Sequence, residues 1–235
     1  QMAADALGLP LERIRLVTTD TYLSPESGSA SASRLTLLGG NAVIGAAEAA
    51  LVRWRNKERP AVATYTYRAP PTTDYDPETG RCVPNFTYSP IAQALEVEVD
   101  TETGELTVPR IVTVVDVGRA VNPKLIQGQV EGSVVQGLGY AVLEDFLTER
   151  GRTLTPNLST YLLPTAVDVP EEAETLILEC PEPIGPWGVR GLGEAPLLGI
   201  APALASAIRS ATGVWFDSLP LTPPTVLEGL LGAGE

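Results

Sequence analysis

The clearest periodic pattern in the chain is an alternation of apolar and acidic residues over 94–100. A period of two residues is typical of a strand with one buried face. Turn-forming residues follow at 101–104, and a second apolar run extends over 106–117. Together these segments predict a β-hairpin. Shorter apolar runs predict further strands over 13–18, 62–68 and 175–179.

Two longer patterns predict helices that are unusually rich in small residues. One helix is expected over 36–57, and another over about 126–143, after an Asn122-Pro123 start signal. Glycine inside a helix costs about 1 kcal/mol relative to alanine. Several glycines in one helix therefore indicate close backbone packing or a nearby ligand.

The two ends of the chain carry weaker signals. A short helix is expected to end at Gly8, which would cap it. An Ala-rich stretch predicts a helix over 197–212, kinked or interrupted near Pro202. The proline-containing tail at 219–230 is expected to be a surface strap.

One segment, 35–52, is long enough to cross a bilayer and carries a single charge, at Glu48. Eight of its eighteen residues are Gly or Ala, whose burial in lipid gains little free energy. A tightly packed interior helix is therefore the favoured interpretation, and no membrane contact is expected.

The composition fits a folded chain with both kinds of secondary structure. Hydrophobic residues make up 44% of the 235 residues, enough for a packed core, and 22 Gly with 21 Pro predict many turns. The mixture of strands and helices predicts an α+β fold, a mixed α/β sandwich. No internal repeat and no domain linker is evident.

Several classes of function are excluded by composition. The chain contains no histidine, which removes Ser-His-Asp and Cys-His catalysis and histidine-containing zinc sites. A net charge of −13 argues against nucleic acids and anionic membranes as partners. Cys82 and Cys180 are too few and too far apart for a disulfide framework, which favours a reducing compartment, the cytoplasm. The start on Gln1, within a helical pattern, indicates a fragment or a processed chain.

Three segments combine glycine or small residues with polar groups. The first, at 27–36, is rich in serine and ends with Arg34 and Thr36 just before a helix. Backbone N–H groups at a helix start, with an arginine, form a plausible anion cradle. A serine-rich surface loop with an ordinary helix cap is the alternative that the sequence alone favours.

The second segment, at 126–139, places three glutamines among glycines, where Gln129 directly follows Gly128. A side-chain amide there could reach a ligand, but a crowded helix–helix contact explains the pattern as well. The third segment, at 185–199, places Glu194 after Gly193 at the start of an otherwise apolar helix. Glu194 is either a stabilising first-turn carboxylate or a general base on a glycine turn.

Together these strings resemble a known family. The sequences VVDVGRAVNPKLIQGQVEGSVVQGLGYAVLED, NLSTYLLPTAVDVP and GPWGVRGLGEAPLLGIAPALASAIRSATG are similar to the C-terminal part of the large molybdenum-binding subunit of the xanthine dehydrogenase/aldehyde oxidase family. The opening segment, followed by SGSASASR, resembles the same region. The resemblance covers essentially the whole chain in family order. It implies that residues 1–235 are the C-terminal part of a molybdopterin-binding domain whose upstream half is absent.

The resemblance also implies a chemistry. Glu194 matches the glutamate that acts as general base toward the molybdenum-bound hydroxyl, and Gln129 matches the glutamine that hydrogen-bonds the apical oxo group. The remaining cofactor-binding positions that the resemblance marks are Gly128, Ala32, Ser33, Arg34, Thr36 and Gly193. No side chain is implied as a metal ligand, since the pterin holds the molybdenum. The implied reaction is hydroxylation of an aldehyde or an N-heterocycle with water as the oxygen source.

The implied cofactor is molybdopterin, in its cytosine dinucleotide form, with [2Fe-2S] and FAD in partner modules. The implied partners are the remaining half of the molybdenum subunit, iron–sulfur and flavin subunits or domains, and a small-molecule substrate, in an oligomer. The sequence departs from many relatives in its SASASR string and in Arg190, where lysine is common. As a fragment, the chain is expected to be inactive alone. A non-catalytic assembly or scaffold domain that retains the fold is the alternative.

Overall fold

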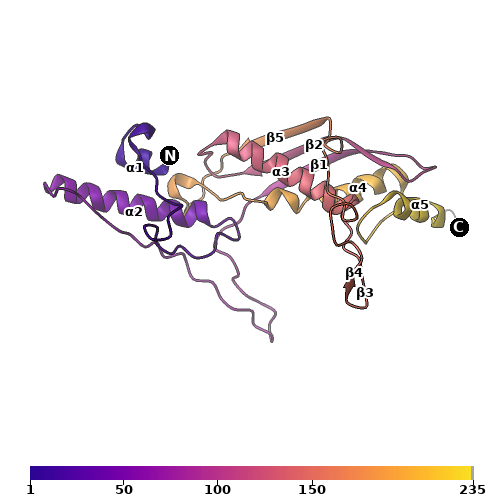
Figure 1. Cartoon of the computed structure of the whole chain (residues 1–235), viewed down its shortest axis with the longest axis horizontal. Helices are drawn as coiled ribbons and strands as arrows, with labels where there is room; N and C mark the ends of the chain where they lie inside the picture. The colour runs from indigo at the N-terminus through magenta and orange to yellow at the C-terminus, as the bar shows by residue number, and fades with distance from the viewer. Residues whose placement is uncertain (234–235) are drawn as a thin grey trace. The chain divides into compact units, whose positions relative to one another are not determined.

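The computed structural model describes residues 1–233, which form two compact units with interleaved sequences (Figure 1). Unit 1 comprises residues 1–89, 116–122 and 178–193. Unit 2 comprises residues 90–115 and 123–177 and the chain from 194 onward. Helices and strands are both present, so the predicted α+β class is confirmed.

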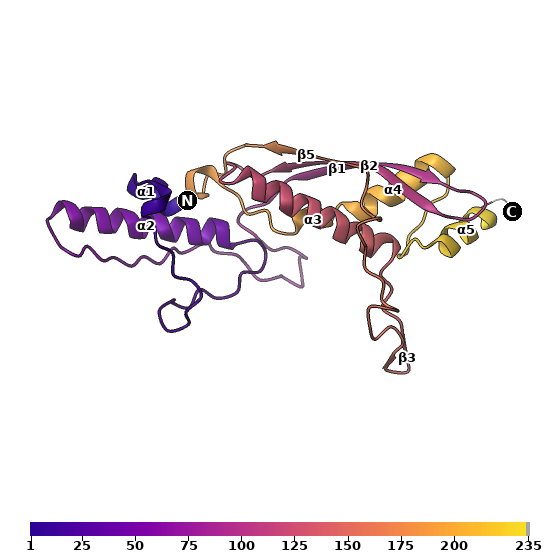
Figure 2. The ribbon, with the colours of Figure 1, turned by 45° about the horizontal axis from the view of Figure 1, so that its top comes forward.

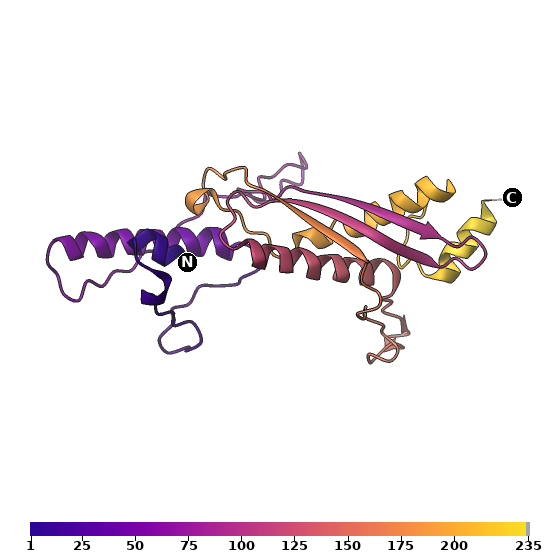
Figure 3. The same cartoon turned by 90° about the horizontal axis from the view of Figure 1, so that it is seen from above.

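Unit 1 is built around two helices that pack against each other, as Figure 3 shows. They are α1 (Met2–Leu7) and α2 (Leu35–Arg55), and short 3₁₀ turns lie at η1 (Leu11–Arg13) and η2 (Pro186–Gly188). Gly8 ends α1 in the left-handed region with φ 64°, as the sequence predicts. Gly40 of α2 has no side chain, and this lets Met2 and Pro186 approach the helix backbone.

Helix α2 differs from the expected interior helix. Its buried positions are Leu37, Gly40 and Ala47, which form one narrow stripe facing α1 and η2, and the remaining residues are half-buried or exposed. The prediction of a tightly packed interior helix is therefore wrong within unit 1, because only one face of α2 is covered there. By length and apolar composition alone, α2 is also a helix that could cross a membrane.

The sheet of unit 2 confirms the predicted hairpin. Strands β1 (Ile91–Val99) and β2 (Leu106–Asp116) pair antiparallel, with Ile91 opposite Val115 and Val99 opposite Leu106. A β-bulge interrupts the register between Glu96 and Glu98. Strand β5 (Glu172–Leu178) completes the order β1-β2-β5, and β3 (Thr148–Glu149) pairs separately with β4 (Arg152–Thr153).

One face of this sheet is covered by helices (Figure 2). These are α3 (Pro123–Val142) and α4 (Ile200–Thr212), preceded by the single turn η3 (Ala195–Leu197), with α5 (Pro223–Gly232) at the end of the chain. The core beneath the hairpin contains Leu204, Ile208 and Val226, all fully buried. At Gly137 of α3, the missing side chain leaves the space that Ile200 occupies.

Several predicted elements are not formed. Residues 14–18 and 61–68 have no regular secondary structure, because neither segment has a strand partner in unit 1. Pro202 does not interrupt α4, since it lies in the first turn, where its missing N–H has no intrahelical partner to lose. The expected strap is in fact helix α5, which begins with Pro223 and Pro224 at the positions where proline is favoured.

Candidate functional site

The glycine turn, residues 191–193, lies against the loop that precedes α2. A Cβ atom at Gly191 would overlap the backbone carbonyl of Ser33, and one at Gly193 would overlap the Ser33 hydroxyl. Gly193 also has φ 51°, a left-handed conformation that side chains rarely adopt. The Ser89 hydroxyl donates a hydrogen bond of 2.7 Å to the Gly191 carbonyl. Only glycine at these two positions permits this approach.

The serine loop, residues 27–33, has a strained backbone where it meets the glycine turn. Ala32 and Ser33 both have positive φ, at 57° and 54°, and this conformation costs about 1–2 kcal/mol for a residue with a side chain. Arg34 follows at the cap of α2 and donates through Nη2 to the Ser27 carbonyl at 3.2 Å. Its Nε is buried and has no hydrogen-bond partner within residues 1–233.

A buried ionic network holds the other side of the glycine turn. The Arg190 guanidinium donates through Nη1 to Glu182 Oε2 at 2.7 Å and to the Tyr88 carbonyl at 2.8 Å. Its Nε lies 3.8 Å from Asp116 Oδ2. The Thr87 hydroxyl donates to Glu182 Oε2 at 2.7 Å. The network therefore joins three separate stretches of unit 1, at 87–88, Asp116 and Glu182, to Arg190, the residue that precedes Gly191.

Asp116 is the second carboxylate of this network and accepts hydrogen bonds from two backbone N–H groups. Burial raises its pKa, but hydrogen bonds from the N–H groups of Gly118 and Cys180, at 2.9 and 3.1 Å, together with the Arg190 charge, outweigh burial. The net effect lowers the pKa of Asp116 below its usual value. Asp116 therefore stays ionised in the folded protein and keeps Arg190 in place.

Glu194 begins the single turn η3 in unit 2. Its φ and ψ are −94° and 12°, and its carbonyl accepts a hydrogen bond of 3.0 Å from the Leu197 N–H. The Glu194 side chain is exposed and makes no capping hydrogen bond. Turn η3 packs against α3, the helix that carries Gln129 near its start. Gln129 is exposed as well.

The structure thus gathers the predicted positions into two groups. In unit 1, Gly193 contacts Ser33, beside Ala32 and Arg34, while Thr36 is exposed in the first turn of α2. In unit 2, the elements that carry Glu194 and Gln129 pack against each other. Gly128 on α3 faces open space, because a Cβ built there would contact nothing within 4 Å.

Comparison with protein families identifies the chain. The family described as molybdopterin cofactor-binding domain matches residues 1–61 and 49–170, well over half of the sequence. The chain belongs to this family. The resemblance of its motifs to the molybdenum-binding subunits of the xanthine dehydrogenase/aldehyde oxidase family is thereby confirmed.

Individual relatives of this molybdopterin cofactor-binding domain support the same family membership. The xanthine dehydrogenase molybdenum-binding subunit of Escherichia coli O157:H7 is 30% identical over 268 aligned positions, which cover all of this chain and 36% of the relative. The aldehyde oxidoreductase of Megalodesulfovibrio gigas is 31% identical, covering 95% of this chain and 26% of the relative. The solved aldehyde oxidoreductase from Desulfovibrio gigas superposes with a TM-score of 0.85 at 30% identity, covering 98% of this chain and 27% of that structure. The chain therefore spans about a quarter to a third of the length of these relatives.

The residues present fit a bulky anionic cofactor. Arg34 offers a guanidinium whose buried Nε lacks a protein partner, which suits a phosphate or another anionic oxygen. Separately, in unit 2, a Cβ at Gly128 would contact nothing within 4 Å, so the backbone of α3 is open to approach there. Within residues 1–233, no group of three or more acidic or cysteine side chains is placed to hold a metal ion.

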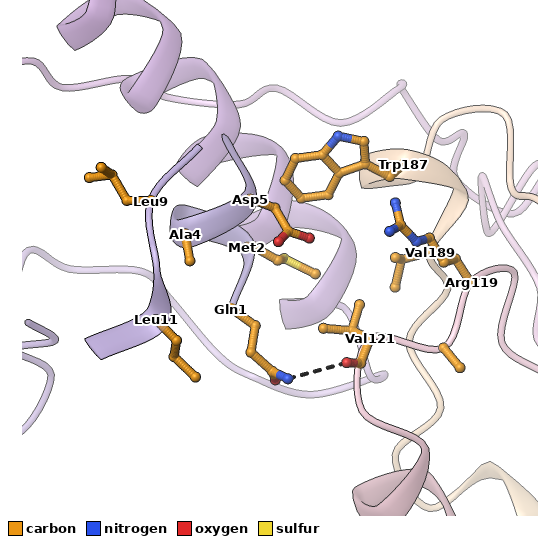
Figure 4. A pocket seen from close by; sticks show the side chains of 11 residues that line it. Gln1, Met2, Ala4, Asp5, Leu9, Leu11, Arg119, Val121, Trp187 and Val189 are labelled. Carbon is orange, nitrogen blue, oxygen red and sulfur yellow. Dashed lines mark hydrogen bonds between the residues drawn. The ribbon is translucent and has the colours of Figure 1, made fainter. Parts of the chain in front are cut away.

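A separate pocket in unit 1 contains none of the predicted site residues (Figure 4). It has a volume of about 270 Å³ and lies between α1 and the segment Arg119–Val121, with Trp187 and Asp5 at its wall. The Gln1 side chain donates to the Val121 carbonyl at 3.3 Å across it. No local sequence pattern predicts this pocket, because its lining comes from three segments that are distant in the chain.

Sequence reasoning also missed Asp116 and Glu182. A signal was present, because Asp116 is an acidic residue among valines at the end of a strand, and Glu182 stands between two prolines. A buried carboxylate requires a cation or several donors, and Arg190 was the available partner in the third segment. What the sequence could not supply was the close approach of these three residues.

We expect Gly193→Ala to destabilise the protein by about 1–3 kcal/mol, because it adds left-handed strain and displaces Ser33. Urea unfolding measures the change. Gly132→Ala, at an open position within α3, is the matched control and should be neutral or stabilising by up to about 1 kcal/mol. Equal stability of the Gly193→Ala variant and the wild type would contradict the close packing of the glycine turn.

The lowered pKa of Asp116 predicts a pH-dependent contribution to stability. Because the folded-state pKa lies below the unfolded value of about 3.9, the contribution is present above that pH and is lost as pH falls through the folded pKa. Asp116→Asn should therefore lower the free energy of unfolding by about 1–3 kcal/mol at pH 7. The difference from wild type should shrink below about pH 4.

Urea unfolding at pH 7 and pH 3 tests this prediction, with Asp74→Asn at an exposed loop position as the control. A difference between wild type and Asp116→Asn that is the same at both pH values would show that the charge of Asp116 does not stabilise the fold.

Proposed function

We propose that the chain contributes part of the catalytic centre of a molybdenum hydroxylase that transfers a water-derived oxygen to an aldehyde or an N-heterocycle. One observation carries the proposal beyond family membership. The exposed Glu194 carboxylate begins a turn that packs against α3, the helix bearing Gln129. A carboxylate and an amide on two packed elements of unit 2 are groups that this reaction can use.

Glu194 is the proposed general base. Its side chain makes no capping hydrogen bond, so the carboxylate is not committed to stabilising η3. In this role Glu194 accepts the proton of the water-derived oxygen as that oxygen is transferred to the substrate carbon. A positioned general base contributes about 10²–10⁴-fold to a rate.

The molybdenum cofactor, when bound, would supply the two-electron oxidation. From unit 2, Gln129 would donate its side-chain amide to the cofactor and Gly128 would permit close approach. From unit 1, the contacts would come from Arg34, by charge, and from Ala32, Ser33, Thr36 and Gly193. The cytosine dinucleotide form is proposed, and its phosphates would find a cation in Arg34.

The rest of the enzyme is proposed to lie in other segments. The relatives are about three to four times longer than this chain. We propose that the remaining half of the molybdenum subunit and iron–sulfur and flavin modules, carrying [2Fe-2S] and FAD, complete the enzyme as a cytoplasmic oligomer. The missing half would build most of the substrate pocket, and this chain alone would be inactive.

Glu194→Gln in the complete enzyme is expected to abolish measurable turnover while leaving the cofactor bound, because only the proton acceptor is removed. Steady-state kinetics and molybdenum content per subunit measure the two effects. Glu228→Gln, an exposed position on α5, is the control. A Glu194→Gln enzyme with wild-type turnover would remove Glu194 from the role of base. If the wild-type enzyme itself lacked turnover with cofactor present, the scaffold alternative would be favoured.

The proposed incompleteness makes a second prediction. The purified 235-residue chain should contain no stoichiometric molybdenum or pterin, because its two groups of cofactor contacts form only part of the site. Metal analysis and pterin fluorescence after oxidation test this. One molybdenum per chain would contradict the proposal that the missing half is required for binding.

A further inference from the structure

Gln93 is a polar residue on the buried face of β1. Along this strand, Ile91, Leu95 and Val97 share its face, which is turned toward the helices, while the alternate residues are exposed. A side-chain amide in such a position costs free energy unless its hydrogen bonds are made. Gln93 therefore requires an explanation that its apolar neighbours do not.

The amide of Gln93 links the sheet to η3. Its Nε2 donates to the Pro196 carbonyl at 2.7 Å and to the Thr113 hydroxyl at 3.2 Å. Thr113 lies opposite Gln93 in the β1–β2 register and is 1% exposed. Pro196 is the second residue of the turn that begins after Glu194. The hydrogen bond therefore joins a rigid strand pair directly to the short turn that carries the proposed base.

The oxygen of the Gln93 amide indicates that glutamine is not the most stabilising residue at this position. Gln93 Oε1 is buried and has no hydrogen-bond partner within residues 1–233. It lies against Gly199, where a Cβ would overlap it. An unsatisfied buried acceptor is destabilising, so an apolar residue would serve the core better than this glutamine. The hydrogen bond that Gln93 donates to the Pro196 carbonyl is therefore the reason we infer for a glutamine at this position.

Turn η3 has little stability of its own. It is a single 3₁₀ turn closed by the Leu197 and Leu198 N–H groups, which donate to Glu194 and Ala195 carbonyls at 3.0 and 3.2 Å. A turn of this length depends on external contacts for its position. The contact from Gln93 reaches its centre.

We propose that Gln93 is a positioning residue for Glu194. By holding the Pro196 carbonyl, it fixes the backbone of η3 and hence the place from which the Glu194 carboxylate reaches the reacting oxygen. The inference rests on the proposed function, because it assigns Gln93 a role in the action of the proposed base. An error of about 1 Å in placing a catalytic group can cost about 10²-fold in rate.

The test uses Gln93→Met in the complete molybdenum enzyme, a change that keeps side-chain length and removes both donated bonds. We expect kcat to fall by about 10- to 100-fold with KM within about twofold and molybdenum content unchanged. Amide exchange should accelerate at least about tenfold in the peptide that contains Leu197 and Leu198. Thr113→Val is the matched control, since it removes the second acceptor and keeps the Pro196 bond. Its kcat should stay within about twofold of wild type, because a single neutral hydrogen bond contributes little.

A conservative variant gives a readout that a merely structural role would not move. In Gln93→Glu, an ionised carboxylate cannot donate to the Pro196 carbonyl, whereas a protonated one can. The activity of Gln93→Glu relative to wild type should therefore rise as pH is lowered, while the ratio for Gln93→Met stays flat. If Gln93→Met fails to fold, the pH dependence of Gln93→Glu activity relative to wild type still tests whether the hydrogen bond to Pro196 is needed.

The outcomes separate this inference from the proposed function. Faster exchange at η3 with unchanged kcat, or unchanged exchange with lower kcat, would each overturn the positioning role. Wild-type turnover of Glu194→Gln would instead overturn the proposed base, and the exchange experiment would still show whether Gln93 holds η3.

Discussion

The packing of the glycine turn against Ser33 depends on the absence of two Cβ atoms. At Gly191 the neighbouring group is a backbone carbonyl, which cannot move aside as a flexible side chain could, and at Gly193 the backbone is also left-handed. In the serine loop, Ala32 and Ser33 also have strained backbones, with positive φ. Strain on both sides of one contact is tolerated only where surrounding interactions enforce it. In unit 1 these interactions come from Arg190.

The network around Arg190 contains two carboxylates and one guanidinium. Buried ion pairs are weak evidence for net stability, because desolvation opposes the attraction between the charges. Their value here is geometric, since Arg190 binds Glu182 and the Tyr88 carbonyl while its own N–H donates to the Val117 carbonyl at 2.8 Å. The residue before the glycine turn is thus fixed by side chain and backbone together. Glu194 follows the glycine turn directly, three residues after Gly191.

From Glu194 onward the chain belongs to unit 2, and contacts within that unit hold turn η3. Turn η3 is held by α3 and by the amide of Gln93, and α4 follows immediately. The base proposed for the reaction therefore begins a short turn that a buried side-chain amide anchors within unit 2. The Glu194 side chain itself is exposed and makes no capping hydrogen bond.

The sequence alone determined the elements whose signals are local. The alternation over 94–100 predicted the hairpin, Gly8 predicted a helix cap, and the motifs around Gln129 and Glu194 indicated the family. Segments whose conformation depends on a distant partner were predicted wrongly, as at 14–18 and 61–68, where no strand lies alongside. Only the tertiary structure brought Asp116, Glu182 and Arg190 together and placed Gln93 within hydrogen-bond distance of the Pro196 carbonyl. Residue type fixes which hydrogen bonds and charges a side chain can offer, but the chain path decides which groups come close enough to use them.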